Sequence, residues 1–273
     1  MGDPRPINAR RLNEAIRRLG GGDEGFVAKR SLMANAIVGQ LLPNGAVKGG
    51  SALKLRFGDS ATRATSDLDA AREGALDSFV EDLEESLAEG WEGFSGRVVR
   101  REPASPRGAP PRYVMQPFEV KLSYRGKPWC TVELELGHDE AGDAEGPDMI
   151  VPAEASGLLR SMGFPELGPV PVMPLHHQIA QKLHGVTGPG SMRAHDLIDL
   201  QVIVARGDVD YPLVRRTCER LFAYRALQPW PSEVRKQEGW DGLYESQALG
   251  TVLPTVGEAV DWANELIGRI ASS

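Results

Sequence analysis

The sequence is poor in cysteine and has no long apolar run. Only Cys130 and Cys218 occur in 273 residues, too few for a disulfide-stabilised scaffold or a zinc site built from cysteines. No apolar run approaches the roughly 18 residues that span a bilayer. The first residues, MGDPRPINARR, lack the apolar segment of a signal peptide. We therefore expect a cytoplasmic protein with two buried thiols and no membrane partner.

The sequence also lacks the positive charge of a general nucleic-acid-binding protein. Its net charge of −7 argues against binding by overall attraction, and no DNA partner is expected. The charges are uneven, however: residues 96–127 hold eight lysines and arginines and two acids, whereas residues 128–154 hold eight acids and no lysine or arginine. The basic stretch favours contact with phosphate; a solvated surface is the alternative for both stretches.

The most informative stretch is AVKGGSALKLRFGDSATRATSDLDA, residues 46–70. The glycine pair lets the backbone approach a ligand closely, and the first amides of the helix that follows point outward toward an anion such as phosphate. Asp67 and Asp69, at positions i and i+2, project to the same face if they lie in a strand. Two carboxylates so close repel each other unless a cation lies between them, and oxygen ligands favour Mg²⁺ (or Mn²⁺). Each motif alone is equally typical of an ordinary turn.

Periodicity divides the chain into a sheet-containing half and a helical half. Apolar spacing predicts helices at residues 7–19, 26–42 and 75–88, then strands at 97–100, 112–124 and 131–137. Prolines and a glycine mark a loop at residues 101–111. From Pro152 onward we expect only helices, at about 152–164, 174–186, 193–206, 213–224 and 256–270. The predicted fold is α+β: a mixed sheet with flanking helices in residues 1–151, and a helical C-terminal domain, residues 152–273, packed against it.

A third acidic position lies in the predicted strand TVELELG, residues 131–137. Glu133 and Glu135 share one face of that strand, and Val132, Leu134 and Leu136 share the other. Either glutamate is a candidate to join Asp67 and Asp69. An edge strand with two solvated glutamates is the alternative.

A strand, a Gly-Gly-Ser turn into a short helix and a strand bearing Asp-x-Asp is the layout of the nucleotidyltransferase superfamily. The chain as a whole resembles one branch of it, the AbiEii/AbiGii-type (MenT-like) toxins of toxin–antitoxin and abortive-infection systems. The segments QKLH (181–184) and RAHDLIDL (193–200) resemble the C-terminal signature of that family, a lysine on one helix and an arginine–aspartate cluster on the next. In the family pattern Arg and Asp are adjacent, whereas here two residues separate Arg193 from Asp196.

The resemblance implies an enzyme that transfers a nucleoside monophosphate from a nucleoside triphosphate, preferably a pyrimidine, to an RNA acceptor. The acceptor implied is the 3′ end of tRNA, so that translation is blocked, and a cognate antitoxin is the implied partner. Because the family acid is followed by an apolar and a small residue, the resemblance selects Glu135, with Glu133 as the alternative. It implies that the metal ligands are Asp67, Asp69 and Glu135, that Lys182 also serves catalysis, and that the nucleotide contacts Gly49, Gly50, Ser51, Arg56, Arg63, Ser66, Asp196 and Asp199.

Other interpretations remain open. Lys182 and the two aspartates could form a surface ion pair between packed helices. The chain could bind nucleotide without transferring it, or modify a small molecule as antibiotic-modifying relatives do. His184 and the His195-Asp196 dipeptide suggest an HD-type metal phosphohydrolase, but this hypothesis leaves residues 49–69 unexplained.

Overall fold

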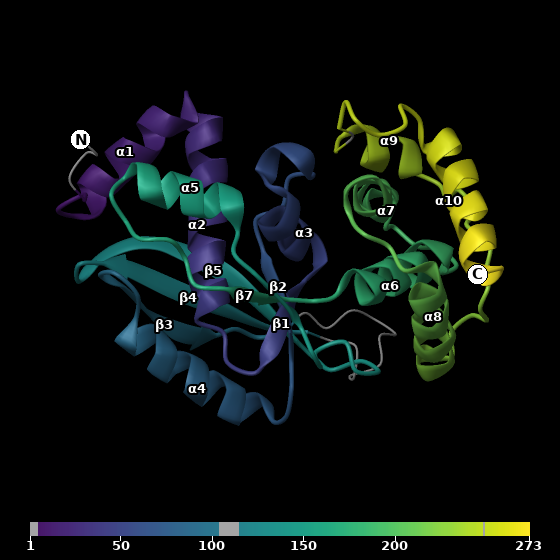
Figure 1. Cartoon of the computed structure of the whole chain (residues 1–273), viewed down its shortest axis with the longest axis horizontal. Coiled ribbons are helices and arrows are strands. Elements are labelled where there is room, and N and C mark those ends of the chain that lie inside the picture. Colours follow the sequence, from purple (N-terminus) through teal and green to yellow (C-terminus); the bar gives the residue numbers. More distant parts are fainter. Residues whose placement is uncertain (1–4, 104–114, 248) are drawn as a thin grey trace. The chain divides into compact units, whose positions relative to one another are not determined.

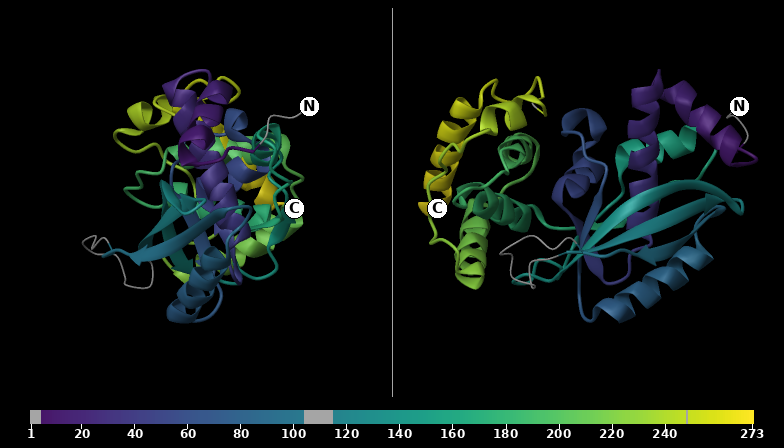
Figure 2. Two further views of the ribbon diagram at one scale, coloured as in Figure 1. Left: turned by 90° about the vertical axis from the view of Figure 1, so that its left-hand side faces the viewer. Right: turned by 180° about the vertical axis from the view of Figure 1, so that it is seen from behind.

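The computed structural model describes residues 5–103, 115–247 and 249–273. The chain forms two compact units (Figure 1, Figure 2). The first contains the described residues of 1–59, 65–139 and 144–172, and the second contains residues 60–64, 140–143 and the described part of 173–273. Most of the loop predicted at 101–111, and the predicted strand start at Arg112, lie outside the described residues.

A mixed sheet runs through the first unit. Its seven described strands follow the order β3-β4-β5-β2-β1-β7-β6. Their bounds are β1 Gly45–Lys48, β2 Leu68–Arg72, β3 Phe94–Arg100, β4 Gln116–Tyr124, β5 Lys127–His138, β6 Asp148–Ile150 and β7 Val170–Val172. Strand β2 pairs antiparallel with β1 and parallel with β5, and β7 runs parallel to β1. The predicted α+β class is confirmed.

The helices of the first unit begin and end close to the predicted positions. They are α1 Ala9–Gly20, α2 Asp23–Gln40, α3 Gly49–Phe57, α4 Leu76–Glu89 and α5 Ala153–Ser161. Local chemistry fixes the ends of α1: the Asn8 side chain accepts a hydrogen bond from the amide of Arg11, and the helix ends at Gly21, whose φ of +70° suits glycine.

The sheet buries one face and exposes the other. Side chains alternate along β4 and β5, so that Val120 and Leu134 are buried in the core while Glu133 is exposed. Helices pack on the buried face. Leu87 of α4 lies so close to Gly96 of β3 that a Cβ added to this glycine would touch it, and Gly39 of α2 lies against Val47 of β1 and Val170 of β7. The opposite face, which we call the open face, carries Ser95, Arg97, Glu119, Lys121, Thr131, Glu133 and Glu135.

The first unit extends further along the chain than predicted. Helix α5 and strand β7 belong to it, so the boundary near residue 151 and the purely helical continuation from Pro152 are wrong. The three residues of β7 read Val-Pro-Val and carry no periodic signal. They form a strand because Val172 pairs with Val47 of β1, a contact between residues distant in the sequence.

The second unit is helical. It contains α6 Leu175–Thr187, α7 His195–Arg206, α8 Tyr211–Arg225, α9 Trp240–Glu245 and α10 Val256–Ala271. Four of these confirm the helices predicted in this half. The short α9 was not predicted, because six residues give no measurable period; the indole of buried Trp240 anchors it by donating to the Ser191 carbonyl at 2.6 Å. Across the described residues, no helix is long and apolar enough to cross a membrane.

The two thiols differ in burial. Cys218 is buried as expected, but Cys130 is only half-buried, which corrects the prediction for that residue. Burial raises the pKa of Cys130 to about 12 and also raises the pKa of Cys218. Both thiols are therefore protonated at neutral pH and unreactive.

His184 fills the interface between α6 and α8. Its ring lies edge-on to Phe222, with centroids 4.8 Å apart, and its Nδ1 lies 3.2 Å from Nη1 of Arg225. Because a guanidinium only donates, Nδ1 accepts and the ring is neutral. Burial, and then the nearby Arg225 and Arg193, lower the pKa of His184 to about 4.

This environment predicts a pH-dependent stability. Between about pH 6.5 and the folded pKa of about 4, the unfolded chain binds a proton at His184 that the folded chain does not, so the free energy of unfolding falls as the pH falls. We expect His184 to contribute about 2–3 kcal/mol to this fall. Urea unfolding from pH 7 to pH 4 should give a steeper loss for the wild type than for His184→Gln, which keeps an acceptor for Arg225. Equal slopes would contradict the prediction.

Candidate active site

Three charged side chains form a row across the middle of the sheet. The strand register places Lys48 of β1 opposite Asp69 of β2, and Asp69 opposite Glu135 of β5. Residues directly opposite on neighbouring strands point to the same face, with Cβ atoms about 4.5–5.5 Å apart. We call this set the carboxylate row. Gly137 of β5 leaves space for the side chain of Lys48, because a Cβ at position 137 would lie 2.8 Å from Nζ of Lys48.

The electrostatics of Glu135 show that the carboxylates affect one another. Partial burial raises the pKa of Glu135, the charges on Asp69 and Asp67 raise it further, and Lys48 opposes them. Glu133, which the sequence left as the alternative, lies opposite Glu119 of β4, one residue before the pairing of β5 with β2 begins at Leu134 and Leu68. The register therefore favours Glu135 as the partner of Asp69.

Asp67 lies next to the row but outside the strand. Strand β2 begins at Leu68, so Asp67 directly precedes the strand that carries Asp69, and its charge also raises the pKa of Glu135. Its Oδ1 accepts a hydrogen bond from Oγ of Ser66 at 2.7 Å.

Three buried polar side chains hold the backbone that leads into β2. Asn35 of α2 donates to the carbonyl of Ser66 at 3.4 Å, and Lys54 of α3 donates to the carbonyl of Thr65 at 3.4 Å. The hydroxyl of Ser51 donates to the carbonyl of Asp67. Sequence analysis missed Asn35 and Lys54, although each is a polar residue within an apolar helical segment, and it assigned Ser51 to phosphate. The side chain of Ser51 instead fixes Asp67.

Gly49 brings the first turn of α3 against Asp69. Its φ of +65° is a conformation that side chains disfavour, and a Cβ on Gly49 would collide with Oδ2 of Asp69. The first amides of a helix have no partners within the helix and carry partial positive charge. The structure thus places the start of a helix beside the carboxylate row.

Arg56 is not at this helix start. It lies in the last turn of α3, where Nη2 is 2.6 Å from Oδ2 of Asp148. Three further predicted nucleotide contacts, Arg63, Asp196 and Asp199, belong to the second unit and form a cluster there with Lys182, which was predicted to serve catalysis.

That ion-pair cluster centres on Lys182. Its Nζ lies 2.9 Å from Asp196 and 2.6 Å from Asp199. Asp199 also pairs with Nε of Arg63 at 3.1 Å. Asp196 pairs with Nε of Arg193 at 2.5 Å, although two residues separate Arg193 from Asp196 in the sequence. The Lys182 side chain is 4% exposed. The pair is therefore buried and is not the surface ion pair considered above.

The cluster fixes its own charge states. Burial lowers the pKa of Lys182, but the Asp196 and Asp199 carboxylates more than offset this, so the pKa is raised overall. Burial acts to raise the pKa of Asp196, and Arg193 and Lys182 together lower it well below its usual range. Lys182 is a cation and Asp196 an anion at any physiological pH.

The described part of the chain contains no preformed metal centre. Among the described residues, no three His, Cys, Asp or Glu side chains are arranged to hold a metal ion. This applies both to the three predicted carboxylates and to the histidines of the HD-type hypothesis, of which His184 contacts Arg225. The all-oxygen donors of Asp67, Asp69 and Glu135, and the repulsion that raises the pKa of Glu135, nevertheless fit a divalent cation chemically.

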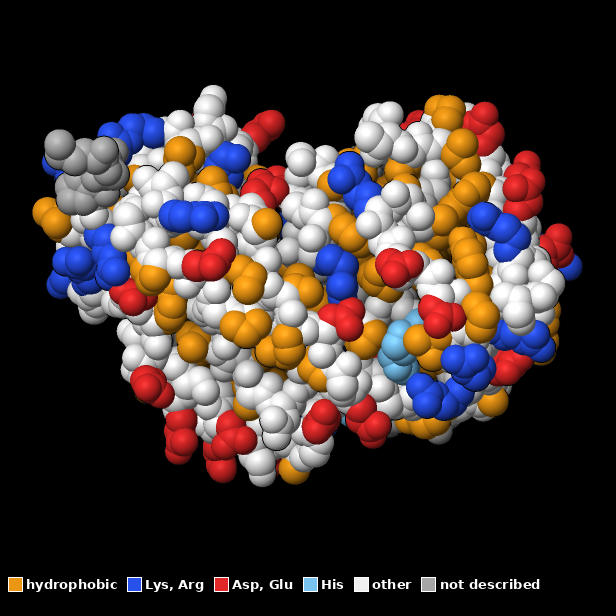
Figure 3. All heavy atoms as spheres, viewed as in Figure 1, with side chains coloured by type: hydrophobic (Ala, Val, Ile, Leu, Met, Phe, Trp, Pro, Cys, Tyr) orange, Lys and Arg blue, Asp and Glu red, His pale blue; other side chains and the backbone are white. Residues whose placement is uncertain are grey.

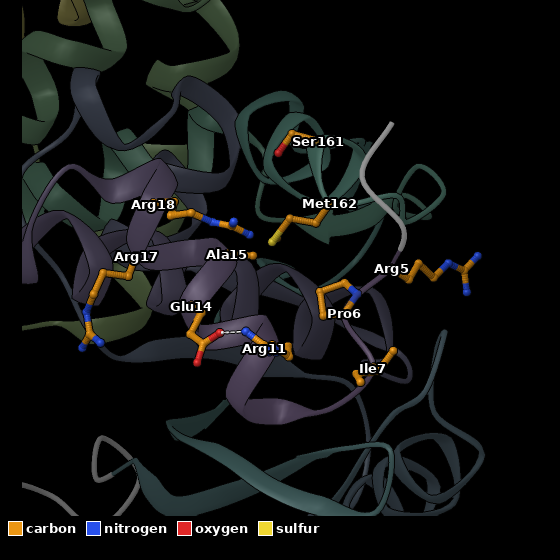
Figure 4. A pocket seen from close by; sticks show the side chains of 10 residues that line it. All are labelled: Arg5, Pro6, Ile7, Arg11, Glu14, Ala15, Arg17, Arg18, Ser161 and Met162. Carbon is orange, nitrogen blue, oxygen red and sulfur yellow. Dashed lines mark hydrogen bonds and ion pairs between the residues drawn. The ribbon is translucent and has the colours of Figure 1, made fainter. Parts of the chain in front are cut away.

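Two hollows lined by described residues of the first unit lie outside the carboxylate row. One, of about 720 Å³, lies between α1 and the end of α5, and its side chains include Arg11, Arg18 and Met162 (Figure 4). The other, of about 430 Å³, lies on the open face and includes Arg97, Lys121 and Thr131. None of the predicted site residues lines either hollow.

The fold is nucleotidyltransferase-like. Its mixed sheet is joined to a short helix through a glycine pair, and the adjoining strands carry carboxylates. Residues 31–263 match the family model described as the nucleotidyl transferase AbiEii toxin of type IV toxin–antitoxin systems. The chain therefore belongs to the AbiEii family, which confirms the resemblance found in the sequence.

One solved structure shows the same fold. MenT4, a nucleotidyltransferase toxin from Mycobacterium tuberculosis H37Rv, is 19% identical with a TM-score of 0.52, and the similarity covers 95% of this chain and 98% of that one. JHP933 from Helicobacter pylori is 13% identical with a TM-score of 0.45, covering 89% and 90%. No curated protein sequence matched.

The contact between Gly49 and Asp69 predicts a severe effect of adding one methyl group. Gly49→Ala should lower the free energy of unfolding by about 1–2 kcal/mol through backbone strain alone, and should also displace Asp69. Gly157→Ala in α5 is the matched control, because nothing lies within 4 Å of its added Cβ, and it should be neutral or slightly stabilising. Thermal unfolding measures both. An unchanged melting temperature for Gly49→Ala would exclude the strain.

The buried cluster predicts that Lys182 stabilises the second unit. Lys182→Met leaves Asp196 and Asp199 without their shared cation, and we expect a loss of about 3–5 kcal/mol in the free energy of unfolding. Lys236→Met is the control: its ion pair with Asp241 is half-exposed and is worth at most about 1 kcal/mol. Urea unfolding distinguishes them, and similar midpoints for the two variants would contradict the prediction.

Proposed function

We propose that this chain is a metal-dependent nucleotidyltransferase toxin acting on RNA. It transfers a nucleoside monophosphate, preferably a pyrimidine, from a nucleoside triphosphate to the 3′ end of tRNA and thereby blocks translation. Membership of the AbiEii family supports nucleotidyl transfer and toxicity, and also a cognate antitoxin as partner. The observation that carries the proposal is the carboxylate row beside the first turn of α3.

Asp67, Asp69 and Glu135 would hold Mg²⁺ or Mn²⁺. When bound, the cation would neutralise charge on the triphosphate and on the pyrophosphate that leaves. Lys48 shares the row with Asp69 and Glu135 and keeps a positive charge near them.

The first turn of α3 would hold the triphosphate. The amides at Gly49, Gly50 and Ser51 are donors for phosphate oxygens, and the hydroxyl of Ser51 keeps Asp67 in place. Ser66, whose hydroxyl donates a hydrogen bond to the carboxylate of Asp67, would also contact the nucleotide. Arg56 and the cluster of Arg63, Lys182, Asp196 and Asp199 remain proposed nucleotide contacts.

The reaction proposed is a displacement at phosphorus. The oxygen of an acceptor hydroxyl bonds to the α-phosphorus and the hydroxyl proton is released to solvent, while the bond from the α-phosphorus to the bridging oxygen breaks and pyrophosphate leaves with its electron pair. The chain's contribution is to fix the triphosphate through backbone amides and to set carboxylates at the reacting end.

The test is transfer of label. Purified protein, Mg²⁺ and total tRNA are incubated with each of the four α-³²P-labelled nucleoside triphosphates in turn. We expect label in tRNA, strongest with a pyrimidine, loss of transfer on chelation of the metal, and a decrease of at least about 100-fold in Asp69→Asn. Circular dichroism checks that the variant is folded.

The two glutamates of β5 supply a matched pair of variants. Glu135→Gln should lose transfer as Asp69→Asn does, because Glu135 lies opposite Asp69, whereas Glu133→Gln should keep most of it. Loss in Glu133→Gln alone would reassign the third carboxylate. Label on a small molecule would replace RNA as the acceptor, and nucleotide binding without transfer to any acceptor would overturn the enzymatic proposal.

A further inference from the structure

The hollow of about 430 Å³ on the open face combines positive charge with hydroxyl groups. Arg97, Lys121 and Thr131 lie directly opposite one another on β3, β4 and β5, and Ser95 and Ser123 form the adjacent pair. We call the first three the cationic row. Arginine, lysine, serine and threonine are the side chains that contact phosphate oxygens in nucleic-acid complexes.

The cationic row is not neutralised within the first unit. Arg97 and Lys121 are like charges directly opposite each other, an arrangement that is unfavourable without an anion. Lys121 lies 3.2 Å from Glu119, which also pairs with Arg101. Arg97 is exposed, and no residue in the described parts of the chain forms an ion pair with it. The hollow therefore keeps a net positive charge.

The position of the hollow relates it to the carboxylate row. Thr131 and Glu135 are four residues apart on β5, which places the two rows about 13 Å apart on one face of one unit. A stacked nucleic-acid strand advances about 3.4 Å per nucleotide. A strand whose end lies at the carboxylate row would thus bring a phosphate about four nucleotides away to the cationic row.

Other charged surfaces of the first unit are less suited to a polyanion. Helix α4 exposes six acids and no basic residue, and Figure 3 shows red side chains gathered over it at the lower edge. In the hollow at α1 most arginines already have acidic partners: Arg11 pairs with Glu14, Arg5 with Glu92 and Arg17 with Asp23.

We propose that the hollow on the open face binds the phosphate backbone of the RNA acceptor, with Arg97 and Lys121 as the phosphate contacts. This inference rests on the proposed function, because it takes RNA as the acceptor. It adds the path of the acceptor strand, along β5 from the cationic row to the carboxylate row.

The test separates binding from transfer. Binding of fluorescently labelled tRNA to wild type, Arg97→Gln and Lys121→Gln is measured by anisotropy at several salt concentrations, without nucleoside triphosphate. We expect each variant to raise the Kd for tRNA about 3- to 10-fold and to reduce the slope of log K against log salt by about one. In transfer assays the KM for tRNA should rise while the KM for the triphosphate stays unchanged.

Arg18→Gln is the matched control, because Arg18 is an exposed arginine of the α1 hollow. It should bind tRNA as the wild type does. Wild-type affinity in both Arg97→Gln and Lys121→Gln, or an equal loss in Arg18→Gln, would overturn the inference even if label still reaches tRNA. A wild type that does not bind tRNA and labels a small molecule would remove this inference together with the proposed RNA acceptor.

Discussion

The close approach of Gly49 to Asp69 is the constraint on which the candidate site depends. Because Lys48 pairs with Asp69, the helix that leaves β1 must begin directly beside that carboxylate. Only a residue without a Cβ fits there, and only glycine adopts the positive φ without strain. The first amides of α3 and the acidic side chains are thereby held together by backbone geometry rather than by flexible side chains.

A second requirement is the precise placement of the chain before β2. Three consecutive carbonyls, from Thr65 to Asp67, each accept a hydrogen bond from a buried side chain of α2 or α3. Buried polar groups are costly unless they are hydrogen-bonded, so Asn35 and Ser51 are tied to this one arrangement of the backbone. Lys54 also forms an ion pair with Asp59 at 2.7 Å. The position of Asp67 is in this way determined by the helices that pack on the sheet.

The two units use charge differently. In the second unit Lys182, Asp196 and Asp199 neutralise one another in a buried cluster, where one lysine serves two aspartates. In the first unit the open face neutralises its charges only in part: among the described residues none forms an ion pair with Arg97, and the carboxylate row has more acids than bases. Charge separation of this kind costs stability and is useful for holding charged ligands.

Much of this protein could be predicted from local sequence. Helices α1 and α4 have apolar stripes and are followed by glycines, and the Gly-Gly-Ser and Asp-x-Asp motifs identified the family. Tertiary structure decided the rest. Four features depend on contacts between residues distant in the sequence. They are the strand β7, the inclusion of α5 in the first unit, the pairing of Asp69 with Glu135 rather than Glu133, and the hydrogen bond from the Ser51 hydroxyl to the carbonyl of Asp67. Periodicity and motifs report only on neighbours along the chain, whereas strand register and buried hydrogen bonds are fixed when separate elements pack together.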